Sequence, residues 1–262
     1  KSSIEWNLAR EVVLGTSLHP ATPALNVQRA CGTSMEAIDI IAAKIATGQI
    51  DSGIGAGSDS NSDLPVMVKR SLAWKLIKLG RAKSLAERIA TILKIRPSEL
   101  KPQYPGITEP RTGLSMGQHA EEMVKSWLIS REEQDMLAYE SHQKAAKGYE
   151  SGFYSDLIIP FKNVSADTIV RGDTTLAKLW VLRTAFDRSP AGTLTAGNST
   201  ALTDGAAAVF LCSEDYAAKN NIPVQAYMRD AAVAAVDYVR AAGLLMAPTH
   251  AVATLLSRNT RI

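Results

Sequence analysis

Asn26-Val-Gln-Arg-Ala-Cys31-Gly-Thr-Ser34 joins a short strand-like run to an amphipathic helix. Apolar residues recur at helical spacing over residues 33–47, and Gly48 follows where a left-handed C-terminal cap is expected. Cys31 is therefore expected at a helix N-terminus, where free backbone N–H groups and the helix dipole favour the nucleophilic thiolate. Gly32 is expected to permit a tight turn and the close approach of a substrate. Because a lone cysteine is most often a small buried hydrophobic residue, this position alone makes Cys31 only a candidate nucleophile.

A glycine-rich run follows the helix directly, with the sequence Asp51-Ser-Gly-Ile-Gly-Ala-Gly-Ser-Asp59-Ser-Asn-Ser-Asp-Leu-Pro65. Since glycine weakens strands, its repetition over residues 53–57 predicts a strand that packs closely against another backbone. The Cys31-Gly-Thr turn, the helix that ends in Ala-Thr-Gly, and the Ala-Gly-x-Asp-Ser-x-Ser-x-x-Pro run together resemble the thiolase family in order and spacing. This resemblance makes Cys31 the expected catalytic nucleophile.

Further matches to the same family extend from about Glu5 to Leu256. The segment Met116-Gly-Gln-His-Ala-Glu121 is similar to the thiolase Met-Gly-x-x-Ala-Glu segment, and residues 129–153 also match closely. The second strong match is Gly192-Thr-Leu-Thr-Ala-Gly-Asn-Ser-Thr200-Ala-Leu-Thr-Asp-Gly205, a turn of small residues that presents Asn198 and Thr200.

Composition describes an ordinary globular protein and excludes few classes. The 262 residues are 46% hydrophobic and 21% charged, and the net charge of +3 is too small to argue for nucleic-acid binding. Two cysteines provide no disulfide framework and suit a reducing compartment. No apolar run is long enough to span a bilayer. The first residues contain neither an initiator methionine nor a signal-peptide core, so we expect the sequence to begin inside a longer chain.

Local patterns predict the remaining elements. We expect helices over residues 6–14, 130–149 and 251–257, and a further helix into which residues 113–121 lead. Strands are expected over 25–28, 53–57, 206–212 and 223–232, the third of these being buried and ending at Cys212. A helical pair is expected within residues 64–97, broken at Gly80 and with a capping box at Ser84. Its second helix is expected to bury the apolar residues Leu85, Ile89, Ile92 and Leu93.

The helical pair is strongly basic. Residues 64–97 contain a single acidic residue, Glu87, and nine basic ones: Lys69, Arg70, Lys75, Lys78, Arg81, Lys83, Arg88, Lys94 and Arg96. Such a run usually forms a solvated helix face. The alternative is a surface for anions, either membrane headgroups or CoA phosphates. Within thiolases, a basic helical insertion resembles the long-chain subfamily that pairs with a hydratase–dehydrogenase partner subunit.

The resemblance implies an α/β fold, the thiolase-like layered α-β-α-β-α sandwich with an inserted, largely helical loop domain. Residues 1–63 and 193–214 would form the N-terminal half, residues 64–192 the inserted loop domain, and residues 223–262 the start of the C-terminal half. A homodimer or homotetramer is expected, in the bacterial cytoplasm or, in a eukaryote, in mitochondria.

The resemblance also implies the chemistry. A thiolase moves an acyl group between a cysteine and CoA, in 3-ketoacyl-CoA thiolysis or acetyl-CoA condensation, and the cysteine divides the transfer into two steps. Backbone N–H groups at the turn, including that of Cys31, could stabilise the oxyanion. The expected CoA contacts are Ser115, Met116, Arg171, Lys178 and Thr200. CoA and acyl-CoA are expected as substrates, with no covalently bound cofactor and no metal.

The histidines do not supply the catalytic base that a thiolase needs. His19 is expected on a surface loop, His142 on a surface helix, and His119 and His250 in structural or interfacial positions. The family's Asn/His-Glu-Ala-Phe segment, its Gly-His-Pro histidine and its Cys-x-Gly cysteine do not occur. We therefore interpret the chain as an incomplete thiolase, with low activity expected for these 262 residues alone.

Two alternative functions remain open at this point. One is a non-catalytic thiolase-like subunit that binds CoA or a partner. The other is a decarboxylating condensing enzyme of the ketoacyl synthase type, which shares the fold and the cysteine. The segments 116–121 and 192–205 favour a thiolase over the condensing enzyme.

Overall fold

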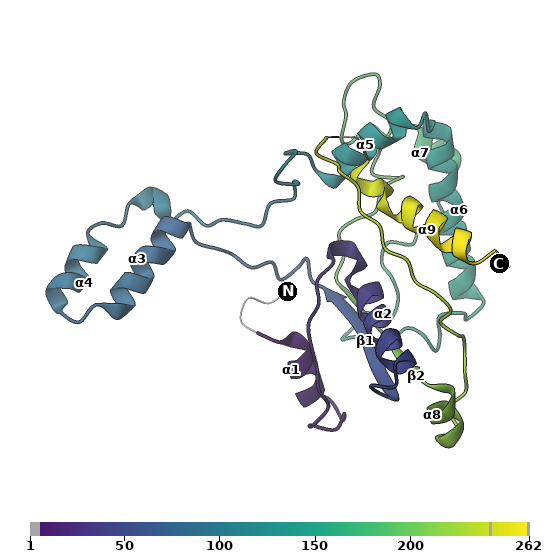
Figure 1. Cartoon of the computed structure of the whole chain (residues 1–262). Helices are drawn as coiled ribbons and strands as arrows, with labels where there is room; N and C mark the ends of the chain where they lie inside the picture. The colour runs from purple at the N-terminus through teal and green to yellow at the C-terminus, as the bar shows by residue number, and fades with distance from the viewer. Residues whose placement is uncertain (1–5, 241–242, 261–262) are drawn as a thin grey trace. The chain divides into compact units, whose positions relative to one another are not determined.

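The computed structural model describes residues 6–240 and 243–260. They divide into two compact units (Figure 1): unit 1 holds the residues up to Gly106 together with Thr203–Arg229, and unit 2 holds Ile107–Leu202 together with the residues from Asp230 onward. The expected domains at residues 1–63, 64–192, 193–214 and 223–262 follow the family architecture, which this division does not test, so they stay a prediction. Their outermost residues, 1–5 and 261–262, lie outside the described part, as do residues 241–242.

Unit 1 is built on a helix that lies across a two-stranded sheet. The strand β1 (Ser52–Asp59) pairs antiparallel with β2 (Gly205–Cys212), in a register that sets Gly55 opposite Val209. The helix α2 (Thr33–Ala46) packs mainly on β1. Gly48 has φ +69°, which confirms the expected left-handed residue after the helix. The strands β1 and β2, which lie far apart in the sequence, thus form the sheet against which α2 packs.

Alternate glycines of β1 allow α2 to approach the strand backbone. A Cβ added at Gly53 would lie 2.9 Å from Ile41, one at Gly55 would lie 2.7 Å from Ile38, and one at Gly57 would lie 2.7 Å from Ser34. Ser34, Ile38 and Ile41, which lie on one face of the helix, therefore contact one face of the strand, where every second residue points to the same side. The prediction of close packing at residues 53–57 is confirmed.

Asp204 closes the open end of this sheet. Its carboxylate accepts hydrogen bonds from the Asn61 N–H at 2.5 Å and from the Ser62 N–H at 3.0 Å, and Ser62 Oγ donates to it at 2.5 Å. The Ser62 hydroxyl, followed by these backbone donors, lowers the pKa of Asp204. The loop after β1 is thereby tied to the segment that enters β2.

Two predictions about unit 1 strands are wrong. Residues 25–28 form no strand, because side chains bind this segment to the start of α1 (Leu8–Leu14): Asn26 Oδ1 accepts from the Ala9 N–H at 3.0 Å, and Asn7 Nδ2 donates to the Ala24 carbonyl at 3.2 Å. Residues 205–210 of β2 are exposed rather than buried, since β1 is the only strand paired with β2 in the described part and α2 lies mainly over β1. Cys212 ends β2 as expected and is half-buried.

The expected helical pair is present as α3 (Arg70–Arg81) and α4 (Leu85–Ile92), which pack against each other. The break follows Arg81, and Gly80 lies inside α3. Ser84 caps α4 as predicted, with its Oγ accepting from the Glu87 N–H at 3.2 Å, whereas the Glu87 carboxylate accepts from the Lys83 N–H. The chain segments before and after the pair are joined by a β-bridge between Met67 and Gln103, whose backbones exchange hydrogen bonds of 2.8 and 2.7 Å.

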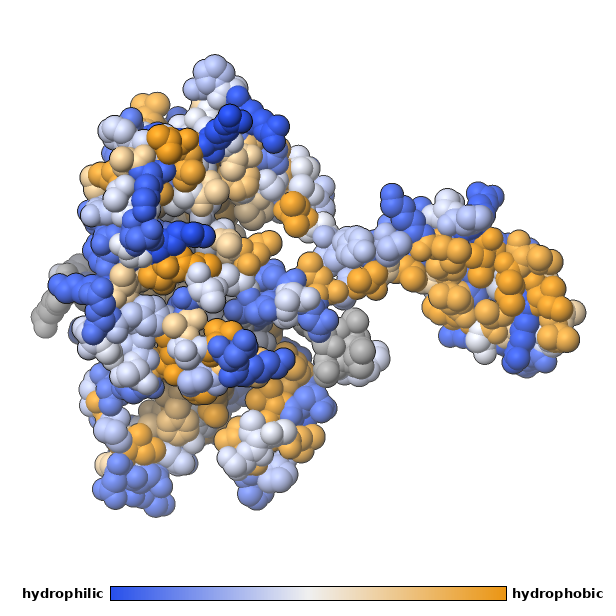
Figure 2. Space-filling view, turned by 180° about the vertical axis from the view of Figure 1, so that it is seen from behind, coloured by the Kyte–Doolittle hydropathy of each residue, from blue (hydrophilic) through white to orange (hydrophobic). Residues whose placement is uncertain are grey.

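The burial predicted for α4 is wrong. Its apolar residues are 50–79% exposed: Leu85, Ile89, Ile92 and Leu93. Among the described elements α4 packs mainly on α3, and a single neighbouring helix covers only part of an apolar face. Figure 2 shows hydrophobic residues gathered over this helical pair, with hydrophilic ones beside them.

A buried ion pair fixes the end of the helical pair. Lys75 Nζ donates to the Glu99 carboxylate at 2.5 Å and to the Lys94 carbonyl at 2.6 Å. Glu99 ends the short helix η2 (Pro97–Glu99) and is 8% exposed. The backbone N–H of Arg96, followed by the Lys75 ammonium, lowers the pKa of Glu99 from about 4.5 to about 2.

Unit 2 is helical in its described part. It contains α5 (Met116–Ser126), α6 (Arg131–Glu150), α7 (Leu176–Trp180), η3 (Leu244–Met246) and α9 (Ala247–Arg258). The capping box at Ser130 is confirmed: Ser130 Oγ accepts from the Glu133 N–H at 3.2 Å, and the Glu133 carboxylate accepts from the Ser130 N–H at 2.8 Å.

The C-terminal elements differ from the predictions. Helix α9 begins four residues before the expected start at residue 251, with Pro248 in its first turn, where a missing N–H costs no hydrogen bond. Residues 223–232 form no strand, because no described segment pairs with them. The remaining helix, α8 (Glu214–Lys219), follows β2 in unit 1. No helix in the described residues is long and apolar enough to cross a membrane.

Replacing Gly55 by alanine should destabilise unit 1. The new Cβ would lie 2.9 Å from Ile38 Cα, so the helix backbone would have to move, and overpacking of this kind costs about 1–3 kcal/mol. The matched control is Gly80→Ala, in α3, where an added Cβ meets nothing within 4 Å and should be neutral or stabilising. Urea unfolding measures both variants, and equal stability of the two would contradict the close contact.

The Lys75–Glu99 pair should make stability depend on pH. Because the pKa of Glu99 is lowered on folding, its contribution is present above about pH 4.5 and is lost as the pH falls towards 2. The difference in unfolding free energy between the wild type and Glu99→Gln should therefore shrink from pH 6 to pH 3. The contribution of the other carboxylates to the pH dependence is the same in both proteins and cancels in this difference. A difference that stays constant over this range would refute the assignment.

Candidate functional site

Cys31 lies where the sequence predicts, in the turn that opens α2. The short helix η1 (Ala30–Gly32) leads directly into α2, and the Cys31 side chain is exposed. Thr33 Oγ1 holds this turn, accepting from the Arg29 N–H at 2.9 Å and donating to the Ala30 carbonyl at 2.9 Å. The contact between α2 and β1 therefore also fixes the position of the candidate nucleophile.

Backbone strain in this turn falls on a residue that the sequence did not single out. Ala30 has φ +38°, in the left-handed region that residues with a side chain seldom adopt, and such strain is concentrated at functional sites. Gly32 has φ −96°, and an added Cβ there would meet only the Arg29 side chain at 3.8 Å. The predicted conformational need for glycine at position 32 is therefore wrong, although the small residue leaves space beside Cys31. The Gly32 N–H donates to the Arg29 carbonyl at 2.8 Å within the turn.

Arg29, two residues before Cys31 in the sequence, forms an ion pair. Arg29 Nη1 lies 2.8 Å from the Glu36 carboxylate, and the two side chains are 46% and 21% exposed. Unit 1 has one described histidine, His19, whose Nδ1 accepts from the Ala21 N–H in its own loop. This contact agrees with the expected role of His19 as a loop residue, and no described histidine of unit 1 accompanies Cys31.

The five expected CoA contacts all belong to unit 2. Ser115 is the N-cap of α5: its Oγ accepts from the Gln118 N–H at 3.3 Å and donates to Gln118 Oε1 at 3.1 Å. Met116 begins the helix and is 42% exposed. The hydroxyl of Ser115 is thus committed to capping, while Met116 presents an apolar, accessible side chain.

Arg171 and Lys178 lie on a segment that packs on α6. The Arg171 N–H donates to His142 Nδ1 at 3.2 Å, and Gln143 Nε2 donates to the Gly172 carbonyl at 2.9 Å. Arg171 is exposed, and no carboxylate in the described residues forms an ion pair with its guanidinium. The Lys178 ammonium is already paired with Asp173, at 2.9 Å. Arg171 is therefore the more available of the two for a phosphate.

The other histidines have structural contacts. His119 is 5% exposed and shares a 2.8 Å hydrogen bond with Thr112 Oγ1, in agreement with the expected structural role. His142 lies on α6, as predicted, is half-buried, and accepts a hydrogen bond from the Arg171 N–H, a contact that the sequence did not indicate. His250 lies within α9 rather than at its expected start.

Thr200 follows a turn that buried carboxylates fasten. Its side chain is exposed and donates to the Ala201 carbonyl at 3.3 Å. Glu121 and Asp135, 3% and 0% exposed, accept hydrogen bonds from residues 193–198. Both carboxylates lie within segments that resemble the thiolase family, but the sequence gives no signal of their role, because only the folded chain brings them to this turn.

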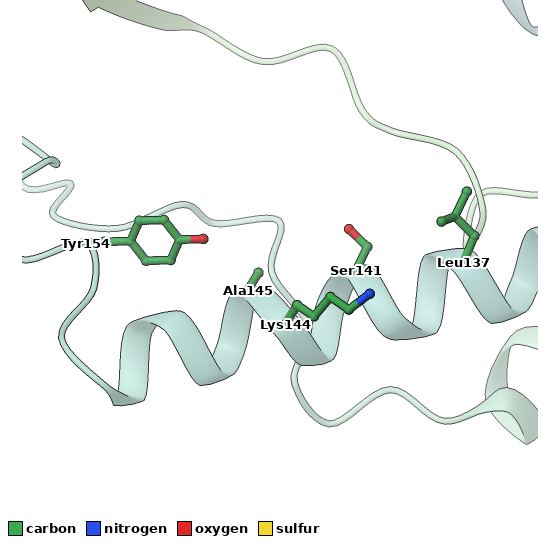
Figure 3. Close-up of a pocket in the computed structure, with 5 residues that line it drawn as sticks. All are labelled: Leu137, Ser141, Lys144, Ala145 and Tyr154. Carbon is green, nitrogen blue, oxygen red and sulfur yellow. The ribbon is translucent and has the colours of Figure 1, made fainter. Parts of the chain in front are cut away.

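Two surface hollows in the described residues contain none of the expected site residues. One, of about 410 Å³, lies along α6 and is lined by Leu137, Ser141, Lys144, Ala145 and Tyr154, whose side chains Figure 3 shows on one side of the helix. The other is lined by residues around His119 and Tyr238. The Tyr238 hydroxyl donates to Glu109 at 3.2 Å, and burial, followed by the charge of Glu109, raises the pKa of Tyr238. No group of three potential metal ligands occurs in the described part.

Comparison with known proteins places the chain among thiolases. The family model described as thiolase, N-terminal domain, matches residues 1–215. The chain is 44% identical over 237 residues to a 3-ketoacyl-CoA thiolase of Klebsiella pneumoniae, covering 88% of this chain and 54% of that protein. It is 41% identical over 258 residues to a 3-ketoacyl-CoA thiolase of Yersinia pestis, covering 96% and 58%. The chain therefore spans rather more than half the length of these relatives.

Solved structures show the same fold. The Acat5 thiolase from Ascaris suum, in complex with coenzyme A, superposes with a TM-score of 0.80 at 24% identity, covering 99% of this chain and 63% of that one. Human mitochondrial 3-ketoacyl-CoA thiolase, in complex with CoA, gives a TM-score of 0.72 at 26% identity, covering 91% and 57%. The expected thiolase-like α/β fold is confirmed.

Proposed function

This chain belongs to the thiolase family, and we propose that the protein containing it is an acyl-CoA C-acyltransferase, which moves an acyl group between Cys31 and CoA. The observation that carries the proposal is the exposed Cys31 thiol, in a strained turn at the start of a helix that is seated on a glycine strand. The names of the bacterial relatives, 3-ketoacyl-CoA thiolase, favour thiolysis of 3-ketoacyl-CoA as the reaction. Acetyl-CoA condensation is the reverse direction of the same chemistry.

The proposed reaction has two transfers. The Cys31 thiolate attacks the 3-keto carbon, the bond between the 2- and 3-carbons breaks, and the departing acetyl-CoA carbanion takes up a proton. The thiol of a second CoA then loses its proton and attacks the acyl-cysteine, which releases the shortened acyl-CoA and regenerates Cys31. Helix N-terminal N–H groups suit the oxyanion of each tetrahedral intermediate.

We propose that Ser115, Met116, Arg171, Lys178 and Thr200 contact CoA. Two of the solved neighbours hold CoA, which supports a CoA site in this fold. Arg171 suits a phosphate, because its guanidinium is exposed and donates bidentately, whereas Lys178 would have to share its ammonium with Asp173. The apolar Met116 suits the pantetheine arm. No further cofactor is needed for this chemistry.

Acetyl-CoA should label Cys31 of the complete protein with an acetyl group. An exposed thiol in a helix-opening turn is the better nucleophile, whereas Cys212 is half-buried at the end of β2. Intact mass and peptide mapping should show one acetyl group on Cys31, lost in Cys31→Ala and kept in the matched Cys212→Ala variant. Acetylation of Cys212 in place of Cys31 would sink the assignment.

A non-catalytic CoA-binding subunit is the second candidate, and it is favoured by the absence of a histidine beside Cys31 in the described residues of unit 1. Such a subunit would bind CoA without becoming acetylated, so the labelling experiment separates the two. The ketoacyl synthase alternative has less support, because the family model and the named relatives are thiolases.

The assembly and its location are also proposals. We infer a homodimer or homotetramer, with a hydratase–dehydrogenase partner subunit, because the basic pair α3–α4 resembles the insertion of the long-chain subfamily. Two relatives are bacterial and one solved neighbour is a human mitochondrial thiolase, which supports the cytoplasm of a bacterium or the mitochondrion of a eukaryote as the location.

The same helical pair is proposed to contact an anionic membrane surface. Nine basic residues accompany one acidic residue over 64–97, and apolar side chains on both helices are exposed, among them Trp74, Leu85 and Leu93. An amphipathic surface with this charge suits anionic headgroups. Only Lys75 is withdrawn from this surface, by its pairing with Glu99.

Removing four exposed charges from the pair should abolish membrane binding. The variant changes Arg70, Lys78, Arg88 and Lys94 to Gln and leaves Lys75 intact, so that the buried pair with Glu99 survives. The matched control removes the same charge elsewhere, at Lys147, Arg183, Arg188 and Lys219, all exposed. At low salt the wild type and the control should float with anionic liposomes, whereas the variant should not, because it lacks the charges that attract the headgroups. Low salt is used because dissolved ions screen exposed charges. Equal flotation of variant and control would reject the membrane proposal.

A further inference from the structure

The first part of the turn before Thr200 is fastened to α5. Glu121, 3% exposed, accepts hydrogen bonds from the Leu194 N–H at 2.7 Å and from the Thr193 N–H at 3.0 Å. Thr193 Oγ1 donates to the same carboxylate at 3.3 Å. One buried side chain thus fixes two consecutive peptide groups to the helix that begins at Met116.

The end of the turn is fastened to α6. Asp135 is fully buried, and its Oδ1 accepts from Asn198 Nδ2 at 2.9 Å. Its Oδ2 accepts from Arg131 Nε at 2.7 Å, and Arg131 Nη2 reaches the Leu179 carbonyl of α7 at 2.8 Å. Arg131 therefore fixes the orientation of the Asp135 carboxylate and, through it, that of Asn198.

Asn198 transmits this orientation to the turn backbone. Its Oδ1 accepts from the Thr195 N–H at 2.7 Å, and the buried Thr195 Oγ1 accepts from the Gly197 N–H at 3.1 Å. A Cβ at Gly197 would lie 2.5 Å from Leu182 and 2.7 Å from Leu179, so the turn sits directly on α7 and the residues after it. Two residues beyond Asn198 the chain reaches the exposed Thr200.

We propose that Glu121 and Asp135 are positioning residues for CoA, which hold the 193–198 turn so that Thr200 is presented to the ligand. The inference rests on the proposed CoA site. Hydrogen bonds to ionised acceptors are the stronger ones, and a turn that is ordered before binding avoids the entropic cost of ordering it on the ligand. In this proposal the two buried carboxylates do not touch CoA themselves. They act on it indirectly, by ordering the turn.

An exchange of side chains isolates the Asp135–Asn198 contact. In Asp135→Asn one amide N–H₂ must face another donor, either Arg131 or Asn198, and in Asn198→Asp two carboxylate oxygens meet. In the double variant D135N/N198D the residue at 135 donates to the residue at 198 and still accepts from Arg131, with the net charge unchanged. The weak contact of 3.4 Å from Asn198 to the Thr193 carbonyl is lost, and the Arg131 ion pair at position 135 becomes a hydrogen bond to a neutral amide.

The test measures CoA affinity by calorimetry on the complete protein. Thr200→Ala should weaken binding by roughly 2- to 10-fold, the value of one hydrogen bond, and each single exchange should do the same. The double exchange should return affinity to about twofold of the wild type. In a Thr200→Ala background, Asp135→Asn and Glu121→Gln should each add less than about twofold, because residues that act through Thr200 are not additive with it.

Three outcomes overturn the inference: a folded Asp135→Asn variant with wild-type affinity, an effect fully additive with Thr200→Ala, or a double exchange that restores thermal stability without restoring affinity. If the single variants do not fold, amide exchange of the free wild type decides. The Thr193, Thr195 and Gly197 amides should be protected before CoA is added, and exchange as fast as at an open loop would also overturn the inference. A wild type that binds no CoA rejects the proposed function instead.

Discussion

The close approach of α2 to β1 is the constraint on which unit 1 depends. Glycine at positions 53, 55 and 57 lets Ser34, Ile38 and Ile41 reach the strand backbone, and every larger residue there would push the helix away. Because α2 begins immediately after Cys31, the same contact sets the place and direction of the turn that carries the thiol. The strain at Ala30 is sustained by this packing and by the Thr33 hydroxyl, which agrees with the rule that unusual backbone conformations persist where their surroundings hold them.

In unit 2 the turn at residues 193–198 is held in place by polar contacts. This turn of small residues has few side chains with which to pack, so buried carboxylates on α5 and α6 supply the contacts that order it. Burying a carboxylate is tolerated only when its oxygens are satisfied, and Glu121 and Asp135 each accept hydrogen bonds from two or more donors. The segment with Arg171 is held on the same helix α6, by His142 and Gln143. Helix α6 therefore supports two groups of proposed CoA contacts.

The helical pair follows neither pattern. Its stability rests on packing between α3 and α4, on the Lys75–Glu99 pair and on the Met67–Gln103 bridge, all within one short segment. Local contacts of this kind leave an apolar face and most of the basic side chains exposed. A surface with both properties differs from a merely solvated helix face, which would carry the charges without the apolar residues. The pair is thus organised as a separate element with an exposed amphipathic surface.

The sequence by itself determined the family, the position of the candidate nucleophile and the elements with local signals. Cys31 at the start of a helix, the glycine strand and the capping residues Ser84 and Ser130 depend on neighbours a few residues away, so their patterns could be recognised directly. Tertiary structure alone decided which segments lack partners, because burial and pairing depend on what lies beside a segment in space. Residues 25–28 and 223–232 are not strands, and the apolar residues of α4 and β2 are exposed. It also decided the roles of Glu121 and Asp135, since their partners lie about sixty to seventy residues away in sequence and meet them only after folding.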